Sequence, residues 1–360
     1  MMVEKLVSIS ADFLYDGIVV PHNVYDIDAK VLLIRQGYTI SETQLQSFRQ
    51  RGLDNVLVSV ETHKLLLENR LSCKVAVQTE LEEKTGYTEV KDETLALLRD
   101  IENEHTVPQD TLYAVSAKLS NKLEITTPDL LLDLINALAP VDEYLQRHSV
   151  DVSLLNGLIG KWMNLPRDTV DLLVMIGLVH DCGKASIPPQ ILNAPRRLAL
   201  AELEIIKMHP GYAYDMLAGF PVEVRYGARG HHEKYNSKGY PDAYGKEVIP
   251  LAARITAVSD IYNAMVSRRV YKDPRSPFEV ISWLRKLSGT DLDPLIVDVF
   301  IHNMPKELLG KPVVLSDGKV GIIHDIDFDN LEYPYIRSGE RVFKSDKDLF
   351  CTHMYFRKDS

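Results

Sequence analysis

Five histidines and two aspartates are spaced along the middle of the chain, and side chains of these two types bind transition metals. Imidazole nitrogen and carboxylate oxygen together suit iron, manganese, cobalt or zinc. Because one ion seldom takes seven ligands from a protein, the set predicts a site for two ions. The seven residues, which span 113 positions, are His148, His180, Asp181, His209, His231, His232 and Asp260.

Each piece of this set is a weak signal by itself. His180-Asp181 has a second copy, His324-Asp325, in the alternating stretch GIIHDIDFD, which predicts a surface strand and turn. A lone histidine is usually a surface residue or a hydrogen-bonded core residue. Asp260 lies inside the apolar segment ITAVSDIYNAM, where a carboxylate needs a metal or an arginine such as Arg254 beside it. The metal site is therefore predicted from the whole set.

The composition is that of a soluble globular protein of two or three domains. The chain has 360 residues, of which 45% are hydrophobic and 26% charged, and its net charge is −10. Such an acidic chain is not expected to bind long nucleic acid, but it can hold a compact phosphate ligand. The sequence contains no apolar run of membrane-helix length and no secretory signal pattern. Together with three distant cysteines, these features favour a cytoplasmic protein.

Local patterns divide the chain into four regions. Strand-like segments and a helix in ISETQLQSFRQRG, capped by Ser41, predict a small mixed α/β domain over 1–70, for which a regulatory role is open. The charged stretch 71–130 predicts a helical linker region. Apolar residues at spacings of three and four predict a helical domain over 131–305, and a hairpin signal in KPVVLSDGKVGIIHDID predicts a small β appendage over 306–360. The expected fold class is mainly α.

In order and spacing, the motifs of the third region resemble the HD-GYP family, a branch of the HD phosphohydrolase superfamily. The resemblance covers roughly residues 140–305, a little under half of the chain. It implies a helical bundle of the HD type that hydrolyses cyclic di-GMP to linear pGpG, or on to GMP, in bacterial second-messenger signalling. The matching segments are RHSVDV, HDCGKASIP, MHPGYAYDML, HHEKYNSKGYPD, IPLAARITAVSDIYNAM, SRRVY and LDP.

The resemblance also implies how the seven ligands divide between two metal ions per chain. Iron or manganese is expected, with zinc, cobalt and nickel as alternatives. A water between two cations is acidified toward hydroxide and can attack phosphorus, so no serine or cysteine nucleophile is required. One ion would be held by His148, His180, Asp181 and Asp260, and the other by His209, His231 and His232, with Asp181 bridging both.

Further residues match family positions near the substrate. Lys184 matches a lysine that contacts the scissile phosphate and is assigned a catalytic role beside Asp181. Tyr240 matches the tyrosine of the Gly-Tyr-Pro signature, and Arg269 and Lys272 match residues that hold phosphate and guanine groups. Simpler interpretations stay open, namely an exposed loop lysine at 184, a plain turn at Gly-Tyr-Pro and a solvated basic run in SRRVYK.

A few positions depart from the family pattern. Tyr144 stands where members with a third metal carry a glutamate, and Glu143 is one residue too early for that helix face, so a binuclear site is predicted. Asn236-Ser237, Asn263 and Arg268 replace an Asp-Gly pair and two aspartates near the expected nucleobase site. Because an amide both donates and accepts hydrogen bonds, Asn263 is predicted to contact substrate and to permit adenine, as in cyclic GMP-AMP.

Two functions of different classes stay open. The intact ligands favour an active cyclic-dinucleotide phosphodiesterase, which in one variant prefers cyclic GMP-AMP. The altered positions near the substrate keep open a sensor that binds cyclic dinucleotides with little turnover. The expected partner is the dinucleotide substrate, with neither long nucleic acid nor a membrane. A homodimer and a signalling partner such as a diguanylate cyclase-type protein are further open possibilities.

Overall fold

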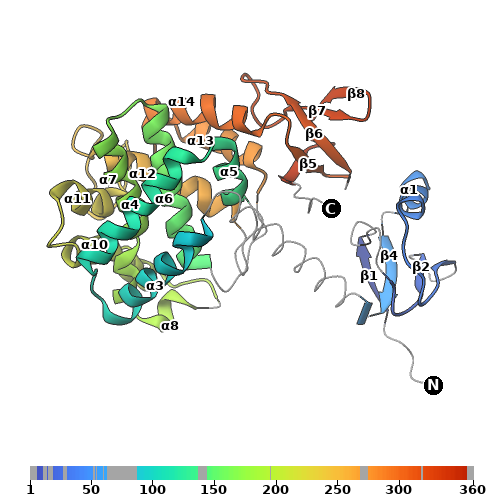
Figure 1. The fold of residues 1–360 in the computed structure, drawn as a ribbon, viewed down its shortest axis with the longest axis horizontal. Helices are drawn as coiled ribbons and strands as arrows, with labels where there is room; N and C mark the ends of the chain where they lie inside the picture. Colours follow the sequence, from blue (N-terminus) through green and yellow to red (C-terminus); the bar gives the residue numbers. More distant parts are fainter. Residues whose placement is uncertain are drawn as a thin grey trace. The chain divides into compact units, whose positions relative to one another are not determined.

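The computed structural model divides into two compact units, Met1–Ala76 and Val77–Asp359 (Figure 1). Within the part that the structure describes, every helix is too short or too polar to span a bilayer. The four-region division drawn from the sequence stays a prediction. The described residues are 6–10, 14, 19–26, 31–51, 53, 55–59, 61–62, 87–136, 144–194, 196–267, 275–317 and 319–354.

The first unit contains a four-stranded antiparallel sheet and the helix α1, which is Glu42–Gln50. The hydroxyl of Ser41 accepts a hydrogen bond from the N–H of Gln44 (3.4 Å), and Gln44 Oε1 accepts one from the N–H of Ser41 (2.9 Å). This reciprocal pair confirms the predicted cap. Figure 1 shows the strands, which lie in the order β1-β4-β2-β3 and are β1 (Leu6–Ser10), β2 (Val24–Asp26), β3 (Leu32–Ile34) and β4 (Asn55–Ser59).

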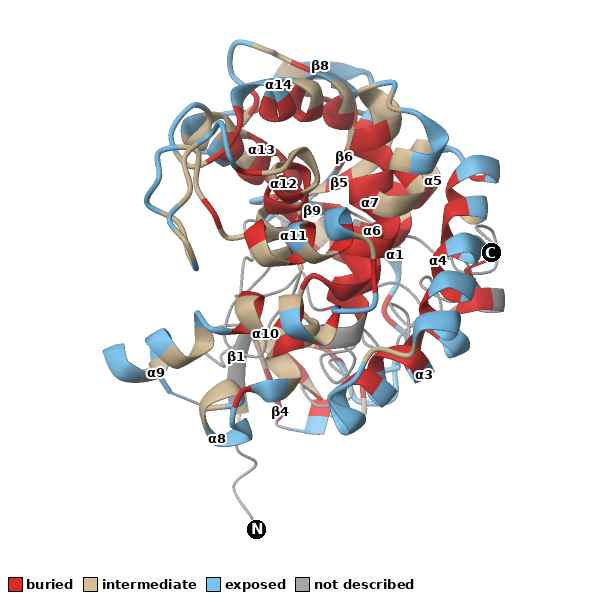
Figure 2. Cartoon of the chain, turned by 90° about the vertical axis from the view of Figure 1, so that its left-hand side faces the viewer, coloured by how far each residue is buried: buried red, intermediate tan, exposed pale blue. Residues whose placement is uncertain are grey.

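The second unit begins as a helical bundle, in which α6 and α7 form a largely buried pair (Figure 2). The near-continuous apolar sequence of α7 explains why this helix is buried around most of its circumference. Pro166 is its N-cap, so the helix begins at Arg167. The bundle contains α3 (Thr88–Glu104), α4 (Gln109–Ile125), α5 (Pro128–Asn136), α6 (Tyr144–Trp162), α7 (Arg167–Val179), η3 (Cys182–Ser186), α8 (Pro189–Leu192), α9 (Leu200–Ile206), α10 (His209–Met216), α11 (Val222–Gly230), α12 (Leu251–Val266), α13 (Pro277–Leu287), α14 (Pro294–Asn303) and η4 (Met304–Leu308).

The second unit ends in a five-stranded antiparallel sheet, and with it the predicted fold class is confirmed. Val313, Ile323 and Ile336 of this sheet belong to the same apolar core as Phe278 of α13 and Ile301 of α14. The sheet therefore packs on the helices. Its strands lie in the order β8-β7-β6-β5-β9 and are β5 (Pro312–Leu315), β6 (Val320–Asp325), β7 (Tyr335–Ser338), β8 (Arg341–Lys344) and β9 (Cys351–Met354).

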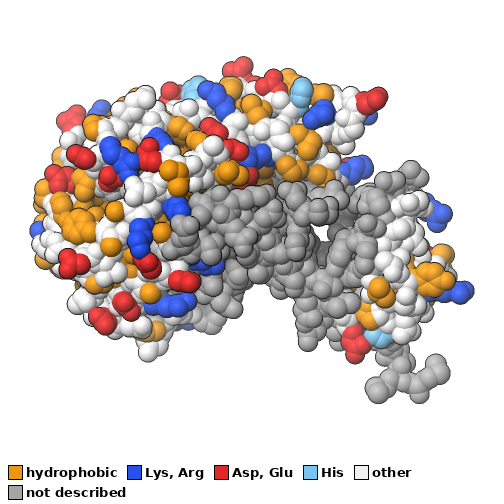
Figure 3. Space-filling model, viewed as in Figure 1, with side chains coloured by type: hydrophobic (Ala, Val, Ile, Leu, Met, Phe, Trp, Pro, Cys, Tyr) orange, Lys and Arg blue, Asp and Glu red, His pale blue; other side chains and the backbone are white. Residues whose placement is uncertain are grey.

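Acidic and basic side chains are interspersed over the face of the helical unit drawn in Figure 3. Many of the unit's charges form ion pairs, such as Arg167 with Asp171 and Arg196 with Glu202, each at 2.7 Å. Mixed charges of this kind largely cancel at a distance. The local groups of a site, rather than the surface as a whole, therefore decide which ligand it attracts.

Candidate metal centre

The seven predicted ligands converge from five segments of the helical unit. His148 lies in the second turn of α6 and Asp260 lies within α12, whereas the other five stand at helix ends. The sequence led us to expect His209 at the end of a helix, but it is the first residue of α10. The histidine of the second His-Asp pair lies at the exposed end of β6, as predicted. The helix-end ligands are His180 after α7, Asp181 before η3, His209, and His231 with His232 after α11.

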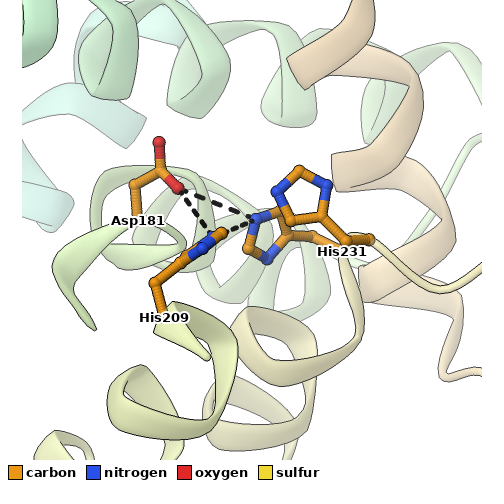
Figure 4. Close-up of side chains that lie close together, drawn as sticks. Asp181, His209 and His231 are labelled. Atoms are coloured by element: carbon orange, nitrogen blue, oxygen red, sulfur yellow. Dashed lines mark hydrogen bonds and ion pairs between the residues drawn. The ribbon is translucent and has the colours of Figure 1, made fainter. Parts of the chain in front are cut away.

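Asp181 lies between two groups of imidazoles, of which Figure 4 shows His209 and His231 close to one of its carboxylate oxygens. Its Oδ1 is 3.2 Å from Nε2 of His209 and 3.8 Å from Nε2 of His231. Its Oδ2 is 3.4 Å from Nε2 of His180 and 3.8 Å from Nε2 of His148. His232 joins the Oδ1 group, in which all potential ligand atoms lie within 4.8 Å of one another. Each carboxylate oxygen thus faces its own group, as a bridging ligand requires.

The backbone fixes which nitrogen of three histidines faces the centre. Nδ1 of His180 is 2.7 Å from the carbonyl of Gly177, Nδ1 of His209 is 2.7 Å from that of Ile206, and Nδ1 of His231 is 2.6 Å from that of Ala228. A carbonyl only accepts, so each Nδ1 carries the proton and donates. Nε2 of each ring is left with a lone pair, which is the state that binds a metal.

This donor set fits transition-metal ions. Nε2 of His209 and Nε2 of His231 lie 3.4 Å apart, so two lone pairs face each other and Oδ1 of Asp181. Among the described residues, Nε2 of His180 and Oδ1 of Asp181 are buried without a hydrogen bond. Acceptors that converge without donors need a cation between them. A histidine and carboxylate cage of this kind suits iron, manganese, cobalt or zinc.

The charge states of the ligands also suit metal binding. Burial alone would raise the pKa of Asp181, but the Lys184 ammonium and His180 hold that pKa well below its ordinary value. Burial, together with the neighbouring His232, holds the pKa of His231 well below the usual value, and burial lowers the pKa of His232 to about 3. At neutral pH, therefore, the carboxylate is ionised and both imidazoles are neutral.

Asp260 lies beside His148, one of the two imidazoles that face Oδ2 of Asp181. Its Oδ1 is 3.1 Å from Nε2 of His148, and its Oδ2 is 4.0 Å from Nδ1 of His232. Burial would raise the pKa of Asp260, but the neighbouring His148 lowers it. Arg254, the alternative partner considered from the sequence, instead pairs with Asp293. The carboxylate therefore faces the imidazoles.

Gly183 lets the turn that carries Asp181 approach the helix that carries His209. A Cβ at position 183 would lie 2.0 Å from the carbonyl oxygen of His209 and 2.5 Å from the backbone nitrogen of Ala213. Both neighbours are backbone atoms of α10, which cannot move aside independently. This close contact sets the separation between Asp181 and His209, the first residue of α10.

Lys184 and Tyr240, two of the predicted substrate residues, border the centre. The Lys184 ammonium donates to Oδ2 of Asp181, so it is held at the site rather than free in a loop. The Tyr240 ring stacks on His232. Glu233 accepts hydrogen bonds from the N–H groups of Asp242 (2.7 Å) and Tyr244 (3.0 Å) and so holds the loop that carries Tyr240. This role of Glu233 was not predicted.

Asn263 lies deeper in the helical unit than a substrate contact suggests. Its side chain is fully buried, at 0% exposure. Its Oδ1 is 2.7 Å from Nδ1 of His148, and its Nδ2 donates to Oδ2 of Asp151 at 3.0 Å. In this structure both ends of the Asn263 amide are engaged by protein groups. Arg269 and Lys272, like Arg268 and Glu143, lie outside the described residues.

The centre borders a pocket that includes residues from outside the resemblance. Leu98 and Ile101 of α3 line it together with Ser149, Asp181 and Lys184. The sequence placed α3 in a linker region and gave no sign that it approaches the site. Apolar side chains close to a charged centre exclude water and strengthen its electrostatic interactions.

Comparisons with known proteins place the residues of this centre in a region that matches a described domain family. A family described as HD domain matches residues 133–296. The chain is 34% identical to "Cyclic di-GMP phosphodiesterase response regulator RpfG" of Xanthomonas campestris, over 42% of this chain and 41% of that protein. It is 33% identical to "Cyclic di-GMP phosphodiesterase PA4108" of Pseudomonas aeruginosa, over 54% of this chain and 48% of that protein. The chain thus spans less than half the length of either relative.

The fold has a counterpart among solved structures. A protein of Bdellovibrio bacteriovorus described as "Bd1817, a HDG"Y"P protein" superposes with a TM-score of 0.51 at 16% identity, over 84% of this chain and 100% of that one. At this identity the likeness concerns the fold alone. The sequence comparisons go further: residues 133–296 match the HD domain, and the two relatives named as cyclic di-GMP phosphodiesterases are similar to this chain over about half of its length.

Proposed function

We propose that the protein is a metal-dependent phosphodiesterase that opens cyclic di-GMP to linear pGpG. The observation that carries the proposal is the position of Asp181, whose two carboxylate oxygens face two separate groups of imidazoles. One ion would be held by His148, His180, Asp181 and Asp260, and the second by Asp181, His209, His231 and His232. We expect two ions per chain, iron or manganese. Metal analysis that finds close to three ions in an active preparation contradicts the binuclear site.

Bound ions would supply Lewis acidity toward the phosphodiester and would acidify water at neutral pH. The remaining roles belong to the chain. Lys184 adds a positive charge beside Asp181, where it would attract and orient the scissile phosphate. Tyr240, held against His232, would present its hydroxyl to the bound dinucleotide. Burial raises the pKa of this hydroxyl, so it stays protonated at neutral pH and can donate a hydrogen bond.

Hydrolysis of defined substrates by defined metal forms of the protein tests the proposal. The protein is purified without oxygen, loaded in turn with iron and manganese, and incubated with cyclic di-GMP, cyclic GMP-AMP and linear pGpG. The products are then resolved by chromatography. We expect pGpG from cyclic di-GMP, and a further product from linear pGpG only if the reaction continues to GMP. Binding of cyclic di-GMP without hydrolysis under every metal would instead establish a sensor.

A further inference from the structure

A chain of four buried polar side chains runs behind the proposed metal centre, from α6 to α12. Its members are at most 6% exposed. Arg147 Nε donates to Asp151 Oδ1 at 2.8 Å, Asp151 Oδ2 accepts from Asn263 Nδ2 at 3.0 Å, and Asn263 Oδ1 lies 2.7 Å from His148 Nδ1. Three of the four residues come from α6, and Asn263 comes from α12.

The order of donors and acceptors in this chain is directional. Asp151 offers only acceptors, so Asn263 must turn its NH₂ group toward Asp151 and its carbonyl oxygen toward His148. That oxygen in turn requires a proton on Nδ1 of His148. Nε2 of His148 is then left with a lone pair, and it is this nitrogen that lies 3.1 Å from Oδ1 of Asp260.

His148 needs a side-chain acceptor for its Nδ1 proton, whereas three other histidine ligands use the backbone. His180, His209 and His231 donate to backbone carbonyls three residues earlier in the chain. His148 lies inside α6 instead of at a helix end, and there the backbone carbonyls accept the hydrogen bonds of the helix itself. A side chain from another helix therefore takes the place of the carbonyl.

We propose that Asn263 and Asp151 are positioning residues that fix the proton on Nδ1 of His148 and so present Nε2 to a metal ion. The inference rests on the proposed metal centre. Arg147 anchors the far end of the chain, since it also donates to the carbonyl of Leu134 in α5 and lies over the Tyr87 ring, 5.7 Å from its centroid. Position 263 thus requires an amide because position 151 holds a carboxylate.

Exchange of the two side chains tests this dependence. In Asn263→Asp two carboxylates face each other, and in Asp151→Asn the amide faces two donors, so each single variant breaks the order of donors and acceptors. In the double variant Asp151→Asn with Asn263→Asp, the new carboxylate accepts from both His148 and the new amide, whose oxygen accepts from Arg147. The double variant therefore restores every hydrogen bond with the same net charge.

The readout is the affinity of the metal-depleted protein for Mn²⁺, measured by calorimetric titration. We expect each single variant to bind Mn²⁺ about 10- to 100-fold more weakly than wild type, because two facing carboxylates, or two facing donors, push the side chain at 263 out of line with Nδ1 of His148, and a misplaced partner of a ligating histidine usually has an effect of this size. The double variant should bind within about threefold of wild type. Single variants with unchanged affinity, or a double variant that melts like wild type yet binds as weakly as the singles, would overturn the proposal.

A matched control separates positioning from general destabilisation. Asn156 is another buried amide of α6 that bonds to α12. Its Nδ2 donates to Thr256 Oγ1 at 2.9 Å and to the carbonyl of Leu173 at 3.0 Å, neither of which is a predicted ligand. Asn156→Asp should lower the melting temperature and leave the Mn²⁺ affinity unchanged. If wild type itself binds no Mn²⁺, the metal centre and the proposed function fail together. If wild type binds it and the single variants do so equally, only the positioning inference fails.

Discussion

The Tyr240 ring stacks on the His232 imidazole, with the ring centroids 4.6 Å apart and the planes inclined by 30°. The loop that carries Tyr240 is held from behind by Glu233, the residue after His232. The loop that carries Tyr240 and the ligand His232 are therefore held together on both sides, by the ring stack and by Glu233. The stack restrains the imidazole from one side, while the loop places the phenol beside the centre.

Substitution of Tyr240 should separate these two roles. Tyr240→Ala removes a ring contact of about 0.5–1.5 kcal/mol, so we expect Mn²⁺ affinity to fall by up to about tenfold. Tyr240→Phe keeps the stack and should leave Mn²⁺ affinity unchanged, but the loss of a hydroxyl donor should raise KM by up to about tenfold. Calorimetry and steady-state kinetics on the same preparations measure both effects. Equal Mn²⁺ affinity of the alanine variant and wild type would show that the stack does not support the ligand.

Loss of the Asp181 carboxylate should abolish turnover. Asp181→Ala removes the group shared by both sets of imidazoles, and a cost of roughly 4 kcal/mol corresponds to about a thousandfold in kcat. Fewer ions per chain should be found by metal analysis. The control is Asp325→Ala, the aspartate of the second His-Asp pair at the exposed end of β6, which should behave as wild type. Turnover by the Asp181 variant near the wild-type rate would refute the site assignment.

Alanine substitutions at two glycines should have opposite effects. In Gly183→Ala the new Cβ meets the backbone of α10, and overpacking of this kind costs about 1–3 kcal/mol. The displaced helix carries His209, so Mn²⁺ affinity should fall as well. In Gly211→Ala, within α10 itself, the nearest atom is 3.7 Å away on Arg229, and alanine favours helix. Urea unfolding should therefore find the first variant less stable and the second at least as stable as wild type.

The metal-depleted protein should lose stability in acid. The pKa of His232 is lowered to about 3 and that of His231 is lowered as well, so between about pH 6.5 and 3 the unfolded chain takes up protons that the folded protein refuses. His180, whose pKa Asp181 raises against the effect of burial, is protonated in both states below about pH 6.5 and adds nothing to the slope in this window. The two lowered histidines give a slope of about 2.7 kcal/mol per pH unit.

Urea unfolding of EDTA-treated protein at pH 7, 6 and 5 measures this slope. The lowered pKa of Asp181 has the same sign, because its contribution is also lost as pH falls. The variant His232→Asn should show a shallower decline. Stability that is constant or rises from pH 7 to pH 5 is the contrary outcome, and it would mean that the imidazoles take up protons in the folded protein.

The ligand set could be predicted because metal chemistry restricts residue types and the motifs keep a fixed order. The two His-Asp pairs illustrate the limit of a single motif, since one lies in the centre and the other at the exposed end of β6. The helices and the C-terminal hairpin also followed from apolar periodicity, because periodicity reports which face of an element is buried. Residue type and apolar periodicity can each be read from a single segment of the sequence.

The roles of Asn263 and Glu233 could not be predicted, because they depend on which groups of other segments face them. An amide next to a ligand motif reads equally well as a substrate contact and as a support for His148, and only the fully buried position of Asn263 favours the support. Likewise, nothing in the sequence of α3 indicates that Leu98 and Ile101 border Asp181. Contacts between distant segments are the information that local patterns lack.

The α3 wall of the pocket has a practical consequence for shortened forms of the protein. The HD-domain match begins at residue 133, but Leu98 and Ile101 belong to the core that surrounds the centre, and Tyr87 lies against Arg147. A fragment cut at residue 133 would expose an apolar strip where α3 had been and would open the pocket to water from that side. We therefore expect such a fragment to aggregate, and the smallest unit with an intact site to start at or before Tyr87.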